Sequence, residues 1–94
     1  MKKQVVKQNV VVESMLADGS LSMAIGTLEK RTTKAIFLTN ASFIAHTGRR
    51  SEFFAGRFDA QVEIEPYPDT MLIEFPAAGA RIYNWPHTLP RTVK

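Results

Sequence analysis

VVVESMLADGSLSMAI, residues 10–25, is the stretch that decides the fold class of this chain. Asp18-Gly19 in its middle suits the two central positions of a type I′ turn, because both positions need a positive φ. A two-residue loop there predicts three cross-strand pairs: Leu16 with Leu21, Ser14 with Met23, and Val12 with Ile25. This register gathers five apolar side chains on one face, namely Val12, Leu16, Leu21, Met23 and Ile25. Pattern and turn together predict an antiparallel β-hairpin.

A second hairpin is predicted downstream, where two prolines separate two short apolar runs. A four-residue loop at residues 66–69 pairs Ile64 with Met71 and Val62 with Ile73, which again collects apolar side chains on one face. The acidic side chains that point the other way are Glu63, Glu65 and Glu74. Their spacing is typical of a solvated strand face that discourages aggregation.

A further turn at residues 76–79 returns the chain through residues 81–85. The side chains on the face opposite Ile73 and Phe75 are then Leu72, Tyr83 and Trp85. Because both faces of this sheet carry apolar groups, we expect it to be closed on itself or covered by another subunit or partner.

The middle of the chain is apolar at consecutive positions and does not alternate. Residues 35–38 and 43–45 are such runs, which suit strands covered on both faces or a short buried helix. Residues 39–42 could turn one strand into the other, whereas Asn40 could equally cap a helix. The pattern favours strands and leaves room for one short helical turn between residues 40 and 56.

These features predict an all-β fold, a small antiparallel meander of about six strands closed as a barrel or compact sandwich. With 94 residues the chain forms a single domain, 1–94, with a frayed basic stretch at 1–8 and an irregular tail at 87–94. The absence of cysteine excludes disulfides and favours a cytoplasmic, reducing compartment. No apolar run is long enough to span a membrane as a helix, so we expect no membrane partner.

The net charge of +3 is unevenly distributed. Residues 1–50 carry eight Lys/Arg against three acids, whereas residues 51–94 carry four against six. This asymmetry permits a basic face without establishing one, because the two halves can interleave in a folded domain.

Catalytic and metal chemistry find little support in the sequence. The two histidines, His46 and His87, belong to no spaced ligand cluster, so we expect no metal and no cofactor. No Gly-x-Ser-x-Gly elbow and no glycine-rich phosphate loop is present. The sequence therefore predicts a non-enzymatic protein without catalytic residues.

The densest feature is GRRSEFFAGRF, residues 48–58, with three arginines and three phenylalanines. Arginine and aromatic side chains are enriched in interfaces, so this segment predicts a surface that binds another protein or copies of the same chain. The predicted partner-binding residues are Arg49, Arg50, Phe53, Phe54, Arg57, Phe58, Leu72, Tyr83 and Trp85. A structural reading stays open, in which the phenylalanines fill the core and the arginines are solvated.

Two other functions remain open. A nucleic-acid-binding β-barrel would place phosphates on Lys30, Arg31, Lys34, Arg49, Arg50 and Arg57, with phenylalanines stacking on bases. A small-molecule pocket would use Arg49, Arg50 and Trp85. The leading prediction is a small protein-interaction module that self-associates or binds and blocks a protein partner.

Overall fold

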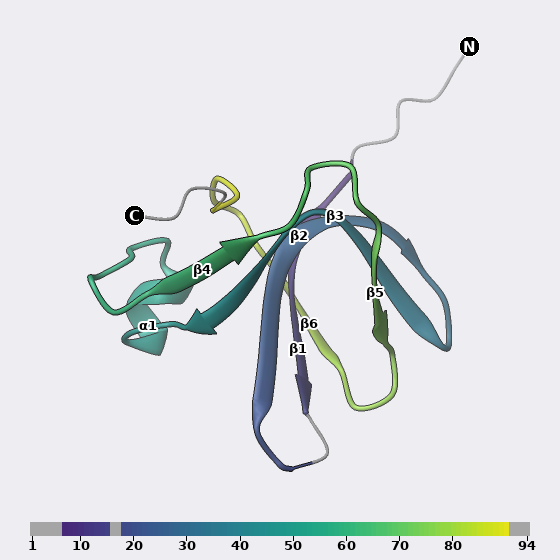
Figure 1. Ribbon diagram of the computed structural model, residues 1–94, viewed down its shortest axis with the longest axis horizontal. Helices are drawn as coiled ribbons and strands as arrows, with labels where there is room; N and C mark the ends of the chain where they lie inside the picture. The colour runs from purple at the N-terminus through teal and green to yellow at the C-terminus, as the bar shows by residue number, and fades with distance from the viewer. Residues whose placement is uncertain (1–6, 16–17, 91–94) are drawn as a thin grey trace.

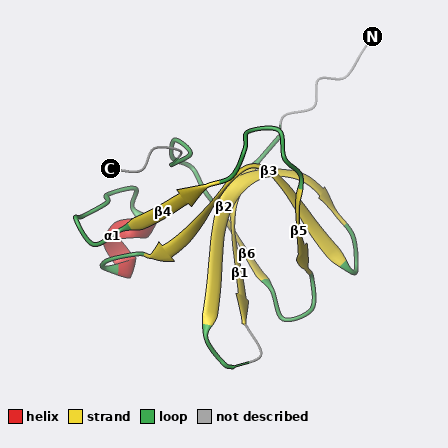
Figure 2. Cartoon of the chain, viewed as in Figure 1, coloured by secondary structure: helices red, strands yellow, loops and turns green. Residues whose placement is uncertain are grey.

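The computed structural model describes residues 7–15 and 18–90, and the statements below concern this part of the chain. It contains six strands and one short helix (Figure 1 and Figure 2). Their bounds are β1 Asn9–Met15, β2 Leu21–Arg31, β3 Ala35–His46, α1 Arg50–Phe54, β4 Glu63–Pro66, β5 Ile73–Pro76 and β6 Arg81–Asn84. In Figure 1, β2 and β3 arch across the molecule, and α1 lies on the opposite side of the view from the turn that joins them.

All six strands belong to one antiparallel sheet with the order β4-β3-β2-β1-β6, and β5 pairs with β3. The prediction of an all-β antiparallel fold is therefore confirmed. The predicted closure as a barrel or compact sandwich is wrong, because the single sheet stays open. Short strands form both of its edges, β4 and β5 beside β3 and β6 beside β1. The short helical turn that the sequence allowed between residues 40 and 56 is α1.

The first hairpin forms, but its predicted register is wrong by one residue. Met15 pairs with Leu21, and Val12 pairs with Ala24 rather than Ile25. The connection is therefore wider than the predicted two-residue loop, and Leu16, which was predicted to pair in it, lies outside the described residues. Asp18 accepts hydrogen bonds from the backbone N–H and hydroxyl of Ser20, which lower its pKa and form a local turn that competes with a tight I′ loop.

The alternation of apolar and polar residues could not predict this register, because side chains on both faces of β1 are buried. Val10, Val11 and Val12 are each at most 1% exposed, although neighbouring side chains in a strand point to opposite faces. A shift by one residue exchanges one set of valines for the other at little cost in hydrophobic burial. The predicted single apolar face therefore did not constrain the pairing.

The predicted second hairpin is wrong, because β4 and β5 do not pair with each other. Both run antiparallel to β3 along the same edge, β4 against its second half and β5 against its first. They act as one long edge strand interrupted by residues 67–72. The backbone follows β3 even there, since Tyr67 N–H donates to the Ala41 carbonyl and Asn40 N–H donates to the Asp69 carbonyl.

Neither the turn nor the helix cap that the sequence allowed at residues 39–42 is found, because β3 continues through these residues and bends instead. Asn40 takes the left-handed backbone conformation, with φ of 51°. On the neighbouring strand, Gly26 faces this bend, and a Cβ there would lie 2.9 Å from the Thr39 carbonyl oxygen and 3.1 Å from the Ala41 Cα. A glycine therefore lets β2 and β3 approach closely where the pairing register shifts.

Two apolar clusters form on the bent sheet. The groove cluster consists of Val11, Met23, Ile25, Ile44, Phe53 and Trp85. The strand cluster consists of Val10, Val12, Ile36, Leu38 and Ala41, and side chains of β5 and β6 pack against it. Because Val11 alternates with Val10 and Val12 along β1, the clusters lie on opposite faces of that strand. The strand cluster is thus covered by strands, whereas the groove cluster depends on α1 and on Trp85 after β6.

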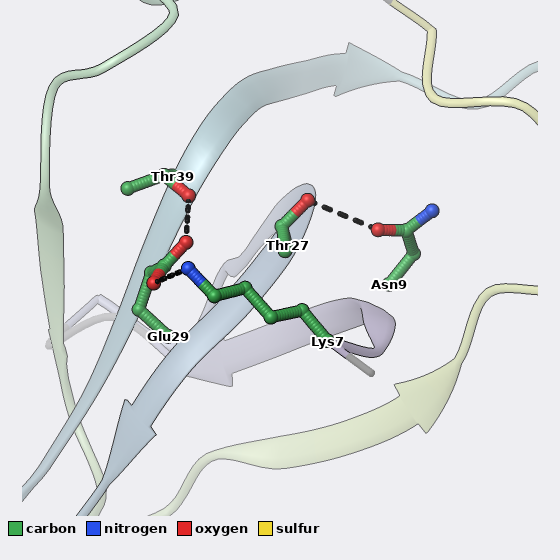
Figure 3. A network of polar contacts seen from close by, with 5 residues as sticks. All are labelled: Lys7, Asn9, Thr27, Glu29 and Thr39. Atoms are coloured by element: carbon green, nitrogen blue, oxygen red, sulfur yellow. Dashed lines mark hydrogen bonds and ion pairs between the residues drawn. The ribbon is translucent and has the colours of Figure 1, made fainter. Parts of the chain in front are cut away.

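A polar network ties the beginning of the described chain to β2 and β3 (Figure 3). Lys7 Nζ lies 2.6 Å from a carboxylate oxygen of Glu29, and the other oxygen of Glu29 accepts the Thr39 hydroxyl. Thr27 donates its hydroxyl to the Asn9 side chain at 3.0 Å. The Lys7 ammonium, followed by the Thr39 hydroxyl, lowers the pKa of Glu29 below its ordinary value of 4.5.

Candidate functional site

A groove of about 1120 Å³ opens beside α1, between the loop that leads into β4, β4 itself and the chain after β6. The first wall is formed by Gly56, Phe58, Asp59, Ala60, Val62, Glu63 and Ile64, and the second by Trp85, Pro86, His87, Thr88, Leu89 and Pro90. Its volume slightly exceeds the range typical of small-molecule sites, about 300–1,000 Å³. The groove is therefore large enough for a segment of polypeptide.

The first wall is held by α1 and by Asp59. Gly48, with φ of 65°, brings the chain round before α1, and a Cβ there would collide with the Asp59 carboxylate. That carboxylate accepts the Gln61 backbone N–H at 2.8 Å. α1 then points Phe53 inward, where the ring is fully buried and lies 5.4 Å from the Trp85 ring. The helix is thus an anchor for the groove floor.

The second wall has no regular secondary structure and is tied down at several points. Ser42, buried in β3, donates its hydroxyl to the Pro90 carbonyl at 2.7 Å. Trp85 Nε1 donates to the Thr88 carbonyl at 3.2 Å. His87 Nε2 lies 3.1 Å from the carbonyl oxygen of Phe54 at the end of α1. These bonds satisfy buried or terminal polar groups and fix the wall relative to the sheet.

Phe58 provides the exposed aromatic surface of the groove. Its ring stacks on Phe53 at 5.0 Å and on Trp85 at 6.2 Å between centroids, yet 40% of the residue remains exposed. Aromatic rings contribute large areas of apolar contact at interfaces. We call this ring, which packs on Phe53 and Trp85 and remains partly exposed, the Phe58 shelf.

The groove is acidic. Asp59 and Glu63 are acidic residues of its lining, and among its described lining residues there is no lysine or arginine. The nearest guanidinium along the chain, Arg57, lies 3.1 Å from the Glu52 carboxylate and is paired with it. The electrostatic character of the groove is thus opposite in sign to the net charge of the chain.

Four of the predicted partner-binding residues fall into three structural situations. Phe58 and Trp85 line the groove, although Trp85 is itself only 2% exposed. Phe53 lies in the core beneath them, as the structural reading of this segment allowed. Leu72 is exposed in the connection between β4 and β5, outside the groove.

The other predicted partner-binding residues, Arg49, Arg50, Phe54, Arg57 and Tyr83, are not among the residues that line the groove. Arg50 lies over the Phe54 ring, 4.8 Å from its centroid, and its Nη2 is 2.9 Å from Glu13 Oε2, an ion pair without hydrogen-bond alignment. Tyr83 donates its hydroxyl to Glu13 at 3.4 Å. Arg49 is exposed at the start of the helix. Arg50 and Tyr83 are thus occupied by contacts within the chain.

The predicted nucleic-acid-binding residues are not brought together. The basic hairpin tip, Lys30, Arg31 and Lys34, is exposed at the turn between β2 and β3. Arg49, Arg50 and Arg57 lie at the other end of β3, around α1 (Figure 1). One phosphate-binding surface formed by all six residues is therefore not found.

Several residues that shape the site were not identified from the sequence. Asp59, Glu63 and His87 line the groove, and Ser42 anchors its second wall. Glu13, which holds Arg50, is only 5% exposed. The one available signal was the position of Glu13 directly after three valines, since a charge in a buried run must find a partner.

Within 7–15 and 18–90, no group of three or more His, Asp or Glu side chains is placed to hold a metal ion. No helix in the described part of the chain is long and apolar enough to cross a membrane.

Comparison with protein-family models, with curated proteins and with solved structures found no match.

Proposed function

We propose that this chain is a small non-enzymatic protein-interaction module that holds a segment of another protein in the groove beside α1. The observation that carries the proposal is the groove itself, with the exposed Phe58 shelf over the buried rings of Phe53 and Trp85. Such an aromatic cluster supplies binding energy through contact area, and its supported rings lose little conformational freedom on binding.

The charge of the groove favours protein over nucleic acid as the partner. Asp59 and Glu63 would repel a phosphate backbone, because like charges brought together at an interface cost several kcal/mol. Arg50 and Arg57, which phosphate binding would need, are paired with Glu13 and Glu52. Of the predicted nucleic-acid-binding residues, this leaves Arg49 and the basic hairpin tip, which lie at opposite ends of β3.

Two titratable residues of the groove lining make contacts that fix its shape. The Asp59 carboxylate accepts the Gln61 backbone N–H, and the His87 ring contacts the Phe54 carbonyl. These contacts hold the two walls in place, which a preformed binding groove requires.

A displayed library of random peptides, selected on the immobilised chain, tests this proposal. Peptides enriched on the wild type should be lost on Phe58→Ser, which removes the exposed shelf. They should be retained on Leu72→Ser, a matched change of an exposed apolar residue outside the groove. Enrichment that ignores Phe58→Ser, or no enrichment at all, would contradict the proposal.

Light scattering after size-exclusion chromatography, with and without DNA and RNA oligonucleotides, separates the alternatives. Our proposal expects no salt-sensitive complex with oligonucleotide. Dimers that persist at high salt and are lost in Phe58→Ser would identify a second copy of the chain as the partner. A complex with oligonucleotide that depends on Lys30, Arg31 and Lys34 would establish the nucleic-acid reading instead.

A further inference from the structure

We infer that the occupant of the groove is an extended protein segment that carries arginine or lysine beside apolar side chains. This inference rests on the proposed function and names the chemistry of the partner. It combines three observations about the groove, namely its carboxylates, its exposed aromatic face and its apolar walls.

The carboxylates provide the first part of the argument. Glu63 is exposed at the start of β4 and makes no ion pair within the described part of the chain. Asp59 lies in the same lining, and its carboxylate accepts the backbone N–H groups of Arg49 and Gln61. Two carboxylates without a cation among the described lining residues match a cationic partner, because complementary charge speeds association and selects against acidic competitors.

The aromatic shelf provides the second part. A guanidinium or ammonium group placed over an aromatic face gains a cation–π interaction, and arginine also stacks its planar group on the ring. The chain makes the same contact internally, where Arg50 lies over the Phe54 ring and reaches the Glu13 carboxylate. Phe58 with Glu63 or Asp59 offers the same pair of groups to a cation from outside.

The apolar walls provide the third part, because they require more than a charged side chain. Val62 and Ile64 on one side and Leu89 on the other line the groove. These residues gain from contact with aliphatic groups, which valine, leucine or the methylene chains of lysine and arginine can supply. A segment that alternates cationic and apolar residues therefore fits both the acidic residues and the apolar walls of the groove.

Two labelled probe peptides test the inference by fluorescence anisotropy at two salt concentrations. In the first, arginine alternates with valine; in its twin, glutamate replaces arginine. The first should bind and the twin should not. Glu63→Lys should weaken binding of the arginine peptide by roughly tenfold or more. Glu74→Lys, the same reversal on an exposed residue of β5 outside the groove, should change it less than about twofold.

The library selection described above separates failure of this inference from failure of the proposed function. Groove-dependent peptides rich in arginine or lysine support both. Groove-dependent peptides that are neutral or acidic overturn the inference and leave the proposed function standing. An equal loss of binding of the arginine peptide in Glu63→Lys and Glu74→Lys overturns the inference as well, because the peptide is then attracted by the overall charge of the chain and not by the groove. A selection without groove-dependent peptides overturns both.

Discussion

The two apolar clusters of this sheet are completed in different ways. The strand cluster is covered mainly by strand residues, with Ile73 and Phe75 from β5 and Ile82 from β6, and by a few residues of the connections. The groove cluster is covered on one side by Ile64 of β4 and Tyr83 of β6, and otherwise by a five-residue helix and a wall without regular structure. Beside this irregular cover the Phe58 ring stays partly exposed and the groove is open. The contrast teaches that the less regular half is the one that keeps an open groove, where we propose that a partner binds.

The largest effect, on both stability and peptide binding, is expected when the buried aromatic ring of the groove cluster is removed. Phe53→Ala should cost about 3–5 kcal/mol of unfolding free energy and abolish peptide binding, because the ring supports both Phe58 and Trp85. Leu38→Ala in the strand cluster should cost about 2–5 kcal/mol but leave binding by the folded fraction intact. Urea unfolding with peptide titration measures both quantities. Equal loss of binding in the two variants would contradict the division between the halves.

The second-largest loss of stability is expected from a substitution at Gly26, which faces the bend in β3. Gly26→Ala should cost about 1–3 kcal/mol, because the added Cβ meets backbone atoms of Thr39 and Ala41 that cannot move independently. Gly79→Asn is the control, since a Cβ there meets nothing within 4 Å and asparagine tolerates its positive φ. Thermal unfolding of both variants measures the difference. An unchanged midpoint for Gly26→Ala would show that the close approach is not required.

A free-energy change of similar size, but with a more local effect, is expected at the hydrogen bond that ties the irregular wall to β3. Ser42→Ala should cost about 1–3 kcal/mol, because the Pro90 carbonyl loses its buried donor. Hydrogen exchange should rise at residues 85–90 and remain unchanged in β5. Ser51→Ala, an exposed serine of α1, serves as the control. A uniform rise in exchange across the sheet would mean that the wall is not a separate unit.

The smallest effect concerns the network around Glu29. Because its folded pKa is lowered, this carboxylate stabilises the fold above its ordinary value of 4.5, and the contribution is lost as the pH falls through the lowered pKa. Glu29→Gln should therefore be less stable than the wild type at pH 7, with a gap that narrows toward pH 2. Urea midpoints across this range, with Glu74→Gln as control, measure it. A gap that widens on acidification would contradict the assignment.

Sequence reasoning predicted the fold class because alternation and turn residues are local signals. The strands of the first hairpin followed from Asp18-Gly19, but the register did not, since Val10, Val11 and Val12 are all buried and either face could serve. The pairing of β4 and β5 with β3 was not predicted. It depends on the bend at Asn40, because the bend lets one edge of β3 pair with both strands. A proline-containing loop between two apolar runs looks the same in either topology.

The site was predicted only in part for a similar reason. The segment that ends in Phe58 was identified from its composition, and Trp85 from its place in the last strand. The sequence could not reveal which aromatic ring is exposed, because Phe53 and Phe58 differ in burial through the packing of α1. The opposite wall, with His87 and Leu89, lies about thirty positions away and carries no motif. Such a site emerges only when the fold brings the segments together.

Backbone amide NMR of the labelled chain, titrated with the peptide most enriched in the selection, tests the central claim most directly. The account predicts that chemical shifts change along residues 56–64 and 85–90, while the basic hairpin tip at residues 30–34 remains unaffected. Changes centred on residues 30–34, or on the connection at 67–72, would place the binding surface elsewhere and contradict the account.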